Sequence, residues 1–502
     1  MRHGRRSPPN GSARLAAGAA LAAGLVVAAG TLHQADGAGS AGPVRQRVAD
    51  ASELLPGGTA TTRGSVDSRD AFSRASHGIG LSGEARFKLG NAVFRKLWVS
   101  APASTKSSDG LGPLYNARGC QNCHLKDGRG RPPEPGESAV SMVVRLSVPP
   151  GTPQEIARLA AGDIAALPEP TYGGQLQTFA IQGFAAEGRV AITYVEEPFT
   201  FPDGTVVHLR RPHLSIADPA YGSLHPGAML SARIAPPMIG LGLIEAIPEA
   251  DIRARADPDD RDGDGISGRV AEVWDHGAKR LALGRFGWKA GQPTLRQQSA
   301  DAFLNDMGLS TSLFPVAWGD CTTAQPACLA APDGNSPGPG DPEVGDQLLD
   351  LVTFYAQNLA VPLRRGAETP EVVRGRDVFA ATGCAACHVP GHVTGTVEGQ
   401  PHLSGQRIWP YTDLLLHDMG DDLADGRPEG SASGREWRTP PLWGIGLTET
   451  VNGHTYFLHD GRARSVEEAI LWHGGEAEAA RDRYARLPRA DRAALLAFVA
   501  SL

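Results

Sequence analysis

The sequence predicts a mainly α fold with a β insertion. Three observations lead to this class. Apolar residues recur at helical spacing in the first and last parts of the chain, whereas residues 138–216 alternate with a period of two. A Cys-x-x-Cys-His motif also occurs twice, each time after a helical pattern. We therefore expect one helical unit to be used twice, with the β segment inserted into its first copy.

The expected helices follow from their apolar faces. Residues 84–97 place Phe87 and Phe94 on one side, together with further apolar residues at helical spacing. The other expected helices cover residues 346–359, residues 371–381 and the segment after Pro488.

Alternating side chains mark the β insertion at about 138–216. Apolar residues occupy every second position in 140–146 and again in 190–194. Residues 199–207 are typical of a hairpin around a Pro-Asp-Gly turn. Helical and loop segments are expected to resume from about residue 219 to residue 330.

The composition is ordinary for a globular protein, since 41% of the 502 residues are hydrophobic and 21% are charged. A net charge of −7 gives no basic surface, which argues against nucleic acid as a partner. The length leaves room for two or three domains, each with its own core.

The N-terminus is expected to direct export. Residues 1–38 resemble a signal peptide, because arginines precede an Ala-, Gly-, Leu- and Val-rich stretch and small residues follow it. An uncleaved anchor is the alternative, and it is the only membrane contact that we expect. Residues 39–80, rich in Gly, Ser and Thr, are expected to form a flexible tether. The mature chain should then lie in the periplasm or on the extracytoplasmic face of the cell envelope.

The two Cys-x-x-Cys-His motifs indicate two covalently attached haem c groups. Thiols one helical turn apart can reach the two vinyl groups, and the next histidine falls beneath the ring as an axial ligand. Disulfides or half of a zinc ribbon are the alternatives, but neither explains a histidine directly after each second cysteine. The residues are Cys120, Cys123 and His124 for the first haem, and Cys384, Cys387 and His388 for the second.

A helix before each motif and another at the end of the chain form the framework of a cytochrome c domain. A Pro-, Gly- and Asp-rich boundary lies at residues 332–345. The sequence therefore predicts two cytochrome c-like haem domains, residues 81–340 with the β insertion and residues 341–502. The remaining cysteines, Cys321 and Cys328, have no following histidine, and in an oxidising compartment we expect them to form a disulfide. A catalytic dithiol is the alternative.

The second axial ligand of each iron decides between electron transfer and catalysis. For the second haem the nearest candidates in the sequence are Met419 and His417. Three histidines that follow later in the chain are further candidates, namely His454, His459 and His473. For the first haem, Met142 lies in a strand-like alternation and is expected to be a core residue. His213 and His225 are further candidates without support.

Two acidic features could carry additional chemistry. Glu245 lies in an apolar stretch that would raise its pKa, so it could act as a catalytic acid–base group, or it could be a buried structural carboxylate. Asp260, Asp262 and Asp264 alternate between glycines like the ligands of a calcium loop. Counted from Asp260, the acidic residue of the EF-hand pattern comes one position late, at Glu272, and a solvated acidic turn is the alternative.

Several long stretches resemble the bacterial di-haem oxidoreductase family, which is related to the di-haem cytochrome c peroxidases and to the methylamine-dehydrogenase maturation enzyme. The resemblance covers about residues 83–502. Besides the haem motifs it rests on Leu111–Asn116, Gly240–Glu249, Asp262–Arg269, Gly284–Lys289, Tyr411–Gly420, Thr439–Gly444 and Phe457–Arg464.

The resemblance implies a division of roles. The N-terminal haem, with His124 as its proximal ligand, would react with peroxide, and the C-terminal haem would deliver electrons. It also implies calcium between the haem domains. Where the related peroxidases tend to have a methionine before His-Asp-Gly, this chain has Leu458, which cannot bind iron.

The leading hypothesis is therefore an exported di-haem oxidoreductase of the peroxidase type. Its partners would be a small electron-donor protein or a quinol-linked donor, and peroxide or another small oxidant. Trp98, Trp288, Trp409 and Trp443 are candidates for a bridge between the haems. A non-catalytic electron-transfer cytochrome and an enzyme that oxidises a protein partner are the alternatives.

Overall fold

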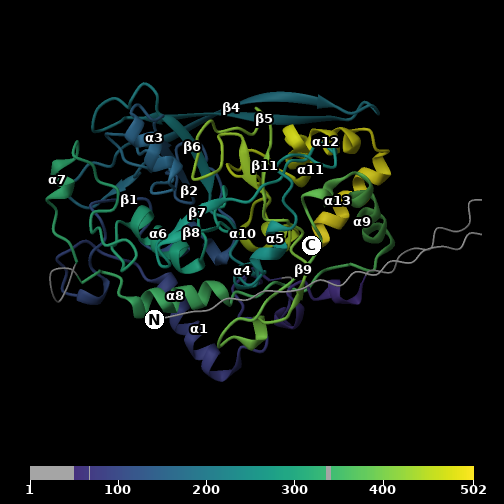
Figure 1. Cartoon of the computed structure of the whole chain (residues 1–502), viewed down its shortest axis with the longest axis horizontal. Coiled ribbons are helices and arrows are strands. Elements are labelled where there is room, and N and C mark those ends of the chain that lie inside the picture. Colours follow the sequence, from purple (N-terminus) through teal and green to yellow (C-terminus); the bar gives the residue numbers. More distant parts are fainter. Residues whose placement is uncertain (1–49, 67, 335–340) are drawn as a thin grey trace, which may run out of the picture. The chain divides into compact units, whose positions relative to one another are not determined.

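Short antiparallel strand pairs lie among the helices of the computed structural model, which describes residues 50–66, 68–334 and 341–502 (Figure 1). Within these residues every sheet has two strands. The pairs are β1 (Leu114–Tyr115) with β3 (Phe179–Ala180), β2 (Met142–Ser147) with β6 (Met229–Ile234), β4 (Arg189–Thr200) with β5 (Val206–Ala217), β7 (Glu272–Asp275) with β8 (Arg280–Leu283), β9 (His392–Val393) with β10 (Arg407–Ile408), and β11 (Leu416–Asp418) with β12 (Glu436–Arg438).

The α-helices are short apart from a few. The longer ones are α1 (Gly80–Arg95), α3 (Pro153–Ala160), α6 (Leu295–Met307), α8 (Asp346–Gln357), α9 (Pro370–Ala381), α12 (Glu478–Ala485) and α13 (Arg489–Ser501). The shorter ones are α2 (Cys120–Cys123), α4 (Leu241–Glu245), α5 (Glu249–Arg253), α7 (Pro326–Leu329), α10 (Thr448–Asn452) and α11 (Val466–Leu471). None of the helices in the described residues has the length and the apolar character needed to cross a bilayer.

The prediction of a mainly α fold is confirmed only in part. Helices make up 30% of the structure and strands 17%, so the fold is mixed. The expected helices are present as α1, α8, α9 and α13. Strands extend beyond the predicted insertion, since β2 pairs with β6, and four further strands lie in the C-terminal part. Strands of two to four residues are too short to show a period in the sequence.

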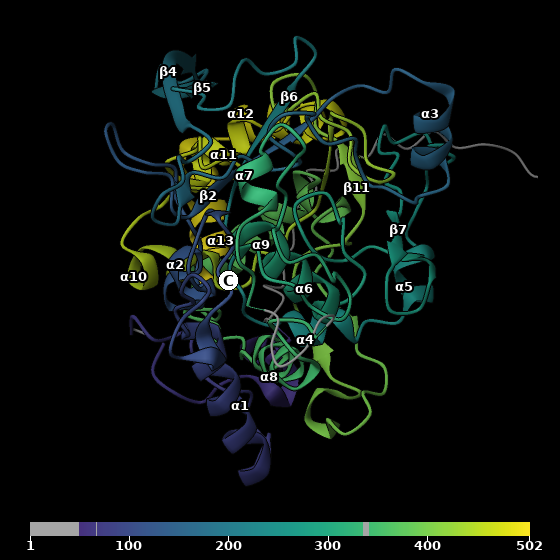
Figure 2. The same cartoon turned by 90° about the vertical axis from the view of Figure 1, so that its left-hand side faces the viewer.

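Two packed helix pairs lie next to the two motifs. In the first, α1 packs along α8, and Phe87 and Phe94 contact the buried ring of Tyr355 at centroid distances of 4.7 and 5.2 Å. In the second, α9 packs against α13, and Phe379 contacts Phe498 at 5.2 Å. Gly375 of α9 makes this approach possible, because a Cβ there would collide with the Ala494 carbonyl oxygen. Figure 2 shows α1 beside α8 at one edge and α9 near α13.

The two predicted domains share cores. All described residues belong to one compact unit. One apolar cluster joins Met142 and Phe201 to Phe379 and Trp437, and another joins Phe72 to Trp443. The predicted division at residue 340 therefore does not appear as two separate cores in space.

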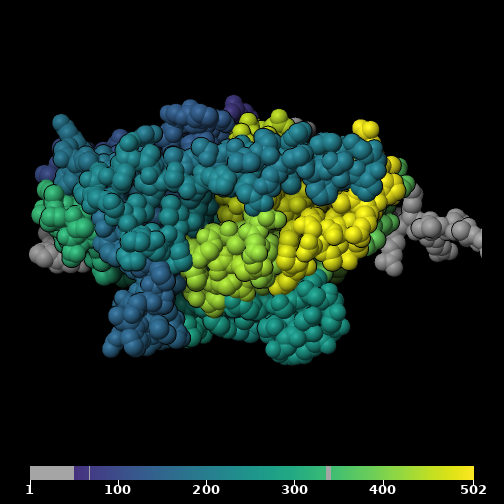
Figure 3. Space-filling view, turned by 90° about the horizontal axis from the view of Figure 1, so that it is seen from above, coloured from purple at the N-terminus to yellow at the C-terminus, as the bar shows by residue number. Residues whose placement is uncertain are grey.

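The β4–β5 hairpin connects the two halves. Its twelve-residue strands run from the N-terminal half over the last helices, seen as the blue band above the yellow segments in Figure 3. Phe201 at its turn is buried against Tyr484, and Arg492 of α13 holds Asp203 at 2.7 Å. The turn predicted at Pro202–Gly204 is confirmed.

The prediction of a flexible tether over residues 39–80 is wrong for its described part. Glu53 is 5% exposed and forms an ion pair with Arg364, and Ala71 and Phe72 are 1% exposed. The Thr62 amide also donates to the Val361 carbonyl oxygen at 3.0 Å. Glycine and serine here serve turns in a packed segment, which composition alone does not distinguish from a loose linker. The predicted signal peptide, residues 1–38, lies outside the described residues.

Candidate functional site

The first motif opens into an N-terminal cavity, which we define by its lining residues Cys120, Cys123 and His124. The motif forms the single turn α2, and Gly119 before it allows close contact with the Lys96 carbonyl oxygen. The His124 Nδ1 atom lies 2.9 Å from the Pro236 carbonyl oxygen. A histidine held through Nδ1 keeps Nε2 for a metal. Burial lowers the pKa of His124 to about 4, so its ring is neutral, as metal binding requires.

The second motif opens into a C-terminal cavity, defined by Cys384, Cys387 and His388. The His388 Nδ1 atom lies 3.0 Å from the Tyr411 carbonyl oxygen, and burial lowers the pKa of His388 to about 4. His124 and His388 therefore share the same environment: a backbone carbonyl oxygen holds Nδ1, and burial keeps the ring neutral.

Both cavities fit haem c. Each cavity is partly open to solvent and has its motif's two cysteines and histidine in its lining, with apolar side chains making up most of the rest. The four motif cysteines are free, and burial raises the pKa of each thiol. Neutral buried thiols are poor redox nucleophiles, which argues against dithiol chemistry. Among the described residues, no group of clustered metal-binding side chains contains two cysteines, as a zinc ribbon requires.

The N-terminal cavity has no second histidine among the described lining residues. Its methionines are Met238 and Met307. Met238 is two residues from Pro236, which holds His124, and Met307 packs in the cluster that contains Phe94. Phe94 in turn lies 6.3 Å from the His124 ring. Met238 and Met307 are thus linked to residues that surround His124 itself.

Carboxylates and arginines from α6 and its neighbours complete this cavity. Asp301 accepts a hydrogen bond from Arg145 at 3.3 Å, and burial raises the pKa of Asp301 although Arg145 opposes the rise. Glu429, by contrast, stays ionised: burial opposes its charge, but Arg233 at 2.8 Å and Arg427 hold its pKa far below the usual range. Of the three described carboxylates that line the cavity, burial thus raises the pKa of Asp301 and Asp306 while Glu429 stays ionised, which is the pattern of acid–base groups beside a fixed charge.

The C-terminal cavity offers other ligands. Met419, His459 and His473 line it, together with Leu458. His459 is stacked on Trp437 with ring centroids 3.7 Å apart, and His473 Nδ1 is held by the Ala469 carbonyl oxygen at 2.7 Å. Met419 and His473 are thus both candidate ligands in this cavity, because His473, like His124 and His388, is held through Nδ1 by a carbonyl oxygen, which keeps Nε2 for a metal.

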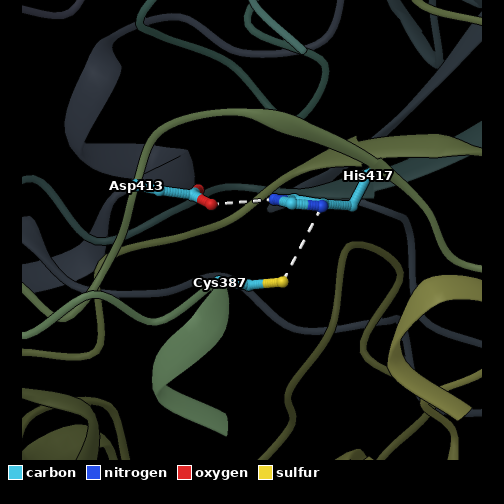
Figure 4. A group of neighbouring side chains, drawn as sticks. All are labelled: Cys387, Asp413 and His417. Carbon is cyan, nitrogen blue, oxygen red and sulfur yellow. Dashed lines mark hydrogen bonds and ion pairs between the residues drawn. The ribbon is translucent and has the colours of Figure 1, made fainter. Parts of the chain in front are cut away.

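His417, the other predicted candidate, is engaged at both ring nitrogens (Figure 4). Its Nε2 atom lies 2.8 Å from Asp413, and its Nδ1 atom lies 3.7 Å from the Cys387 sulfur. The Nδ1 atom is also 2.6 Å from Glu476, which the figure does not draw. Burial disfavours the charged ring, yet the hydrogen bonds to Asp413 and Glu476 raise the pKa of His417. A protonated ring has no lone pair for iron, so His417 supports the wall of this cavity without being a ligand.

The two cavities share one wall. Arg129, Trp288, Arg438, Pro440 and Pro441 line both of them. The Trp288 indole donates to the Ile234 carbonyl oxygen at 2.8 Å. Of the four predicted bridging tryptophans, Trp288 alone lines both cavities in the described structure.

Glu245 does not line either cavity. It accepts the Leu295 amide at 2.7 Å and the Gln357 side chain at 2.7 Å, so it holds the start of α6 against α8. This geometry favours the structural alternative over the catalytic role. Sequence reasoning missed Asp301 and Arg145 among others: Arg145 is a charge within the apolar strand β2, whereas Asp301 lies in the polar helix α6 and carries no such signal.

Met142 is fully buried in an apolar cluster, as predicted, and His213 and His225 line neither cavity. Cys321 and Cys328 are joined in the structure with Cα atoms 6.1 Å apart, a separation that a disulfide spans.

The predicted calcium ligands come together. Carboxylate oxygens of Asp260, Asp262 and Asp264 lie within 4.8 Å of one another. Glu272 is not part of the group, because it forms an ion pair with Arg253 at 2.5 Å. The loop borders the C-terminal cavity, since Asp264 lines it and the Ser267 hydroxyl donates to Glu476 at 2.9 Å.

The family described as "Di-haem oxidoreductase, putative peroxidase" matches residues 50–502. No curated protein and no solved structure matches the chain.

Proposed function

The chain belongs to the di-haem oxidoreductase family, and from that premise we propose that it is an exported c-type cytochrome that reduces peroxide. The N-terminal cavity holds the reactive haem and the C-terminal cavity holds the electron-transferring haem. When bound, haem supplies an iron that exchanges electrons and can coordinate a small oxidant.

The observation that carries this proposal is the difference between the two linings. In the N-terminal cavity, His124 is the sole described histidine, and Asp301 and Arg145 are present instead. In the C-terminal cavity, Met419 is available beside His459 and His473. An open iron suits a reacting ligand, whereas a filled coordination sphere suits electron transfer.

Asp301 supplies the acid–base group. It is a carboxyl group in the cavity lining, and burial raises its pKa, the direction in which a carboxylate becomes a better proton acceptor from an oxidant's hydroxyl and its acid form more populated. Arg145 keeps the carboxyl group in place and stabilises negative charge that develops beside it. Trp288 in the shared wall provides an aromatic path between the cavities.

Electrons come from outside, from a small electron-donor protein or a quinol-linked donor. Export to the periplasm is supported by the signal-like N-terminus and by the paired Cys321 and Cys328, because disulfides persist in oxidising compartments.

Electron paramagnetic resonance of the oxidised protein tests the assignment of roles. We expect one high-spin signal, which cyanide or peroxide changes, and one low-spin signal, which they leave unchanged. Two low-spin signals with no response to either ligand would instead support a non-catalytic electron carrier.

The loop of Asp260, Asp262 and Asp264 binds calcium in this proposal, and so supports the C-terminal cavity through Ser267 and Glu476. Calcium at 100 times its dissociation constant would stabilise the fold by about 2.7 kcal/mol. Thermal unfolding with calcium and with a chelator measures this, and Asp262→Asn should remove the difference. A chelator without effect on the wild-type protein would exclude the site.

A further inference from the structure

Two arginines in the wall between the cavities have no acidic partner. Arg129 is 7% exposed, and its Nε and Nη1 atoms are buried without a hydrogen-bond partner. No carboxylate of the described residues lies within ion-pair distance of it. Its guanidinium group lies 5.8 Å from the centre of the Trp288 ring and 5.7 Å from that of the Phe457 ring.

Arg438 is the second of these cations. It is 8% exposed, and it donates from Nε to the Gly287 carbonyl oxygen at 3.0 Å and from Nη1 to that of Thr439 at 3.1 Å. Its hydrogen bonds thus go to neutral carbonyl oxygens, and Asp413, which favours its charge, lies beyond ion-pair distance. Burial lowers the pKa of both Arg129 and Arg438 to about 10, and both stay protonated at neutral pH.

The fold holds both side chains at this wall by backbone contacts. Gly128 and Gly130 flank Arg129, and a Cβ at either would collide with Asn452 or with the Ser141 carbonyl oxygen. The Arg129 amide donates to the Asn452 side chain at 3.0 Å. The Arg438 amide donates to the Trp288 carbonyl oxygen at 2.9 Å.

A nearby buried arginine, by contrast, has acidic partners. Arg233, 7% exposed, is paired with Glu429 at 2.8 Å and lies 3.8 Å from Asp425. A buried charge without such a partner is strongly unfavourable, so an arginine kept in that state indicates an anion that the chain does not supply. Guanidinium groups bind carboxylates best, often through two parallel hydrogen bonds.

We propose that Arg129 and Arg438 bind the propionate carboxylates of both haems, so that the two cofactors share one pair of cationic residues. The inference rests on the proposed function, because it requires a haem in each cavity. Haem carries two propionates, and both arginines line both cavities. They are positioning residues, which set the orientation of each haem and its charge environment.

A shared cation has a measurable electrical consequence. A positive charge next to a haem disfavours the oxidised, more positive iron and so raises the reduction potential. Removal of Arg129 should therefore lower the potentials of both haems together. Removal of a cation that lines only one cavity should lower at most one.

Spectroelectrochemical titration of the holoprotein tests this. Arg129→Leu is expected to shift both midpoint potentials to lower values. Arg129→Lys keeps the positive charge and is expected to keep both potentials close to their wild-type values. Arg285→Leu is the matched control, because Arg285 is also buried but lines the N-terminal cavity alone and donates to the Ile244 and Ile247 carbonyl oxygens. We expect it to leave the C-terminal haem unchanged. If Arg129→Leu does not fold, Arg438→Leu provides the same test.

Other outcomes overturn the proposal. A shift at one haem only, or at neither, in both Arg129→Leu and Arg438→Leu would show that the cations are not shared. A free carboxylate is the other source of the anion: formate would then lower both wild-type potentials together, whereas tethered propionates leave them unchanged. The proposed function fails separately, by the absence of two haems in the pyridine haemochrome assay or of any reaction with peroxide.

Discussion

The N-terminal and C-terminal cavities begin from the same motif and end with different linings. In both, a single turn carries the cysteines, and a backbone carbonyl oxygen holds the histidine Nδ1 atom at 2.9 or 3.0 Å. Beyond that common base, the N-terminal cavity receives Asp301, Arg145 and Glu429, while the C-terminal cavity receives Met419 and His473. The comparison teaches that one motif can sit in two different linings, and in the proposed function it is the lining that separates the roles of the two haems.

The source of the difference lies in which segments cover each motif. α6 and the end of β6 cover the first cavity and bring charged side chains with them, whereas α11 and the segment after β11 cover the second and bring apolar groups and sulfur. Two ion pairs, Arg233 with Glu429 and Arg145 with Asp301, offset part of the cost of burying charges in the first cavity.

The largest expected effect separates the two histidines. His124→Gly should abolish peroxide turnover to the level of the uncatalysed reaction, because the reactive iron loses its protein ligand. His388→Gly should leave cyanide binding to the oxidised N-terminal haem intact while steady-state turnover falls. Stopped-flow absorption with peroxide and cyanide measures both, with haem content per chain as the control. Equal loss of cyanide binding in the two variants would contradict the division of roles.

The next effect tests the acid of the N-terminal cavity. Asp301→Asn should lower kcat/KM for peroxide by about 10²–10⁴-fold, the usual contribution of general acid–base catalysis. Glu245→Gln should lower it by no more than a few-fold, because Glu245 does not line the cavity. Steady-state kinetics under identical donor concentrations compares them. The reverse order of effects would return the catalytic role to Glu245.

A smaller effect concerns the midpoint potential of the C-terminal haem. Met419→Leu should lower the midpoint potential of the C-terminal haem, since a methionine ligand raises that potential. Met307→Leu, in the N-terminal cavity, should leave both potentials close to their wild-type values. Redox titration reports the two haems separately. An unchanged C-terminal potential would favour His459 or His473 as the ligand.

The smallest effect lies away from both cavities. Replacement of Cys321 and Cys328 by serine opens a loop with a sequence separation of 7 residues and should cost about 2 kcal/mol of unfolding free energy. Peroxide turnover should not change, because neither residue lines a cavity. Chemical denaturation of the double variant measures the cost. A large loss of turnover would revive the catalytic dithiol.

The sequence by itself indicated the candidate attachment residues, the helices that precede each motif and the family. These features are local: two thiols one turn apart and a histidine beside them need no distant partner, and a helix face needs only its own spacing. The same holds for the turn of the long hairpin at Pro202–Gly204.

The tertiary structure decided which groups face each cavity. Asp301 and Glu245 are both carboxylates in apolar surroundings, and only packing turns one into the cavity and the other to the start of α6. Arg129 and Arg438 are far apart in the chain, yet they line the same wall. Contacts between such distant residues depend on strand pairs such as β11 with β12. These strands are only three residues long, so the sequence shows no period from which the pair could be predicted.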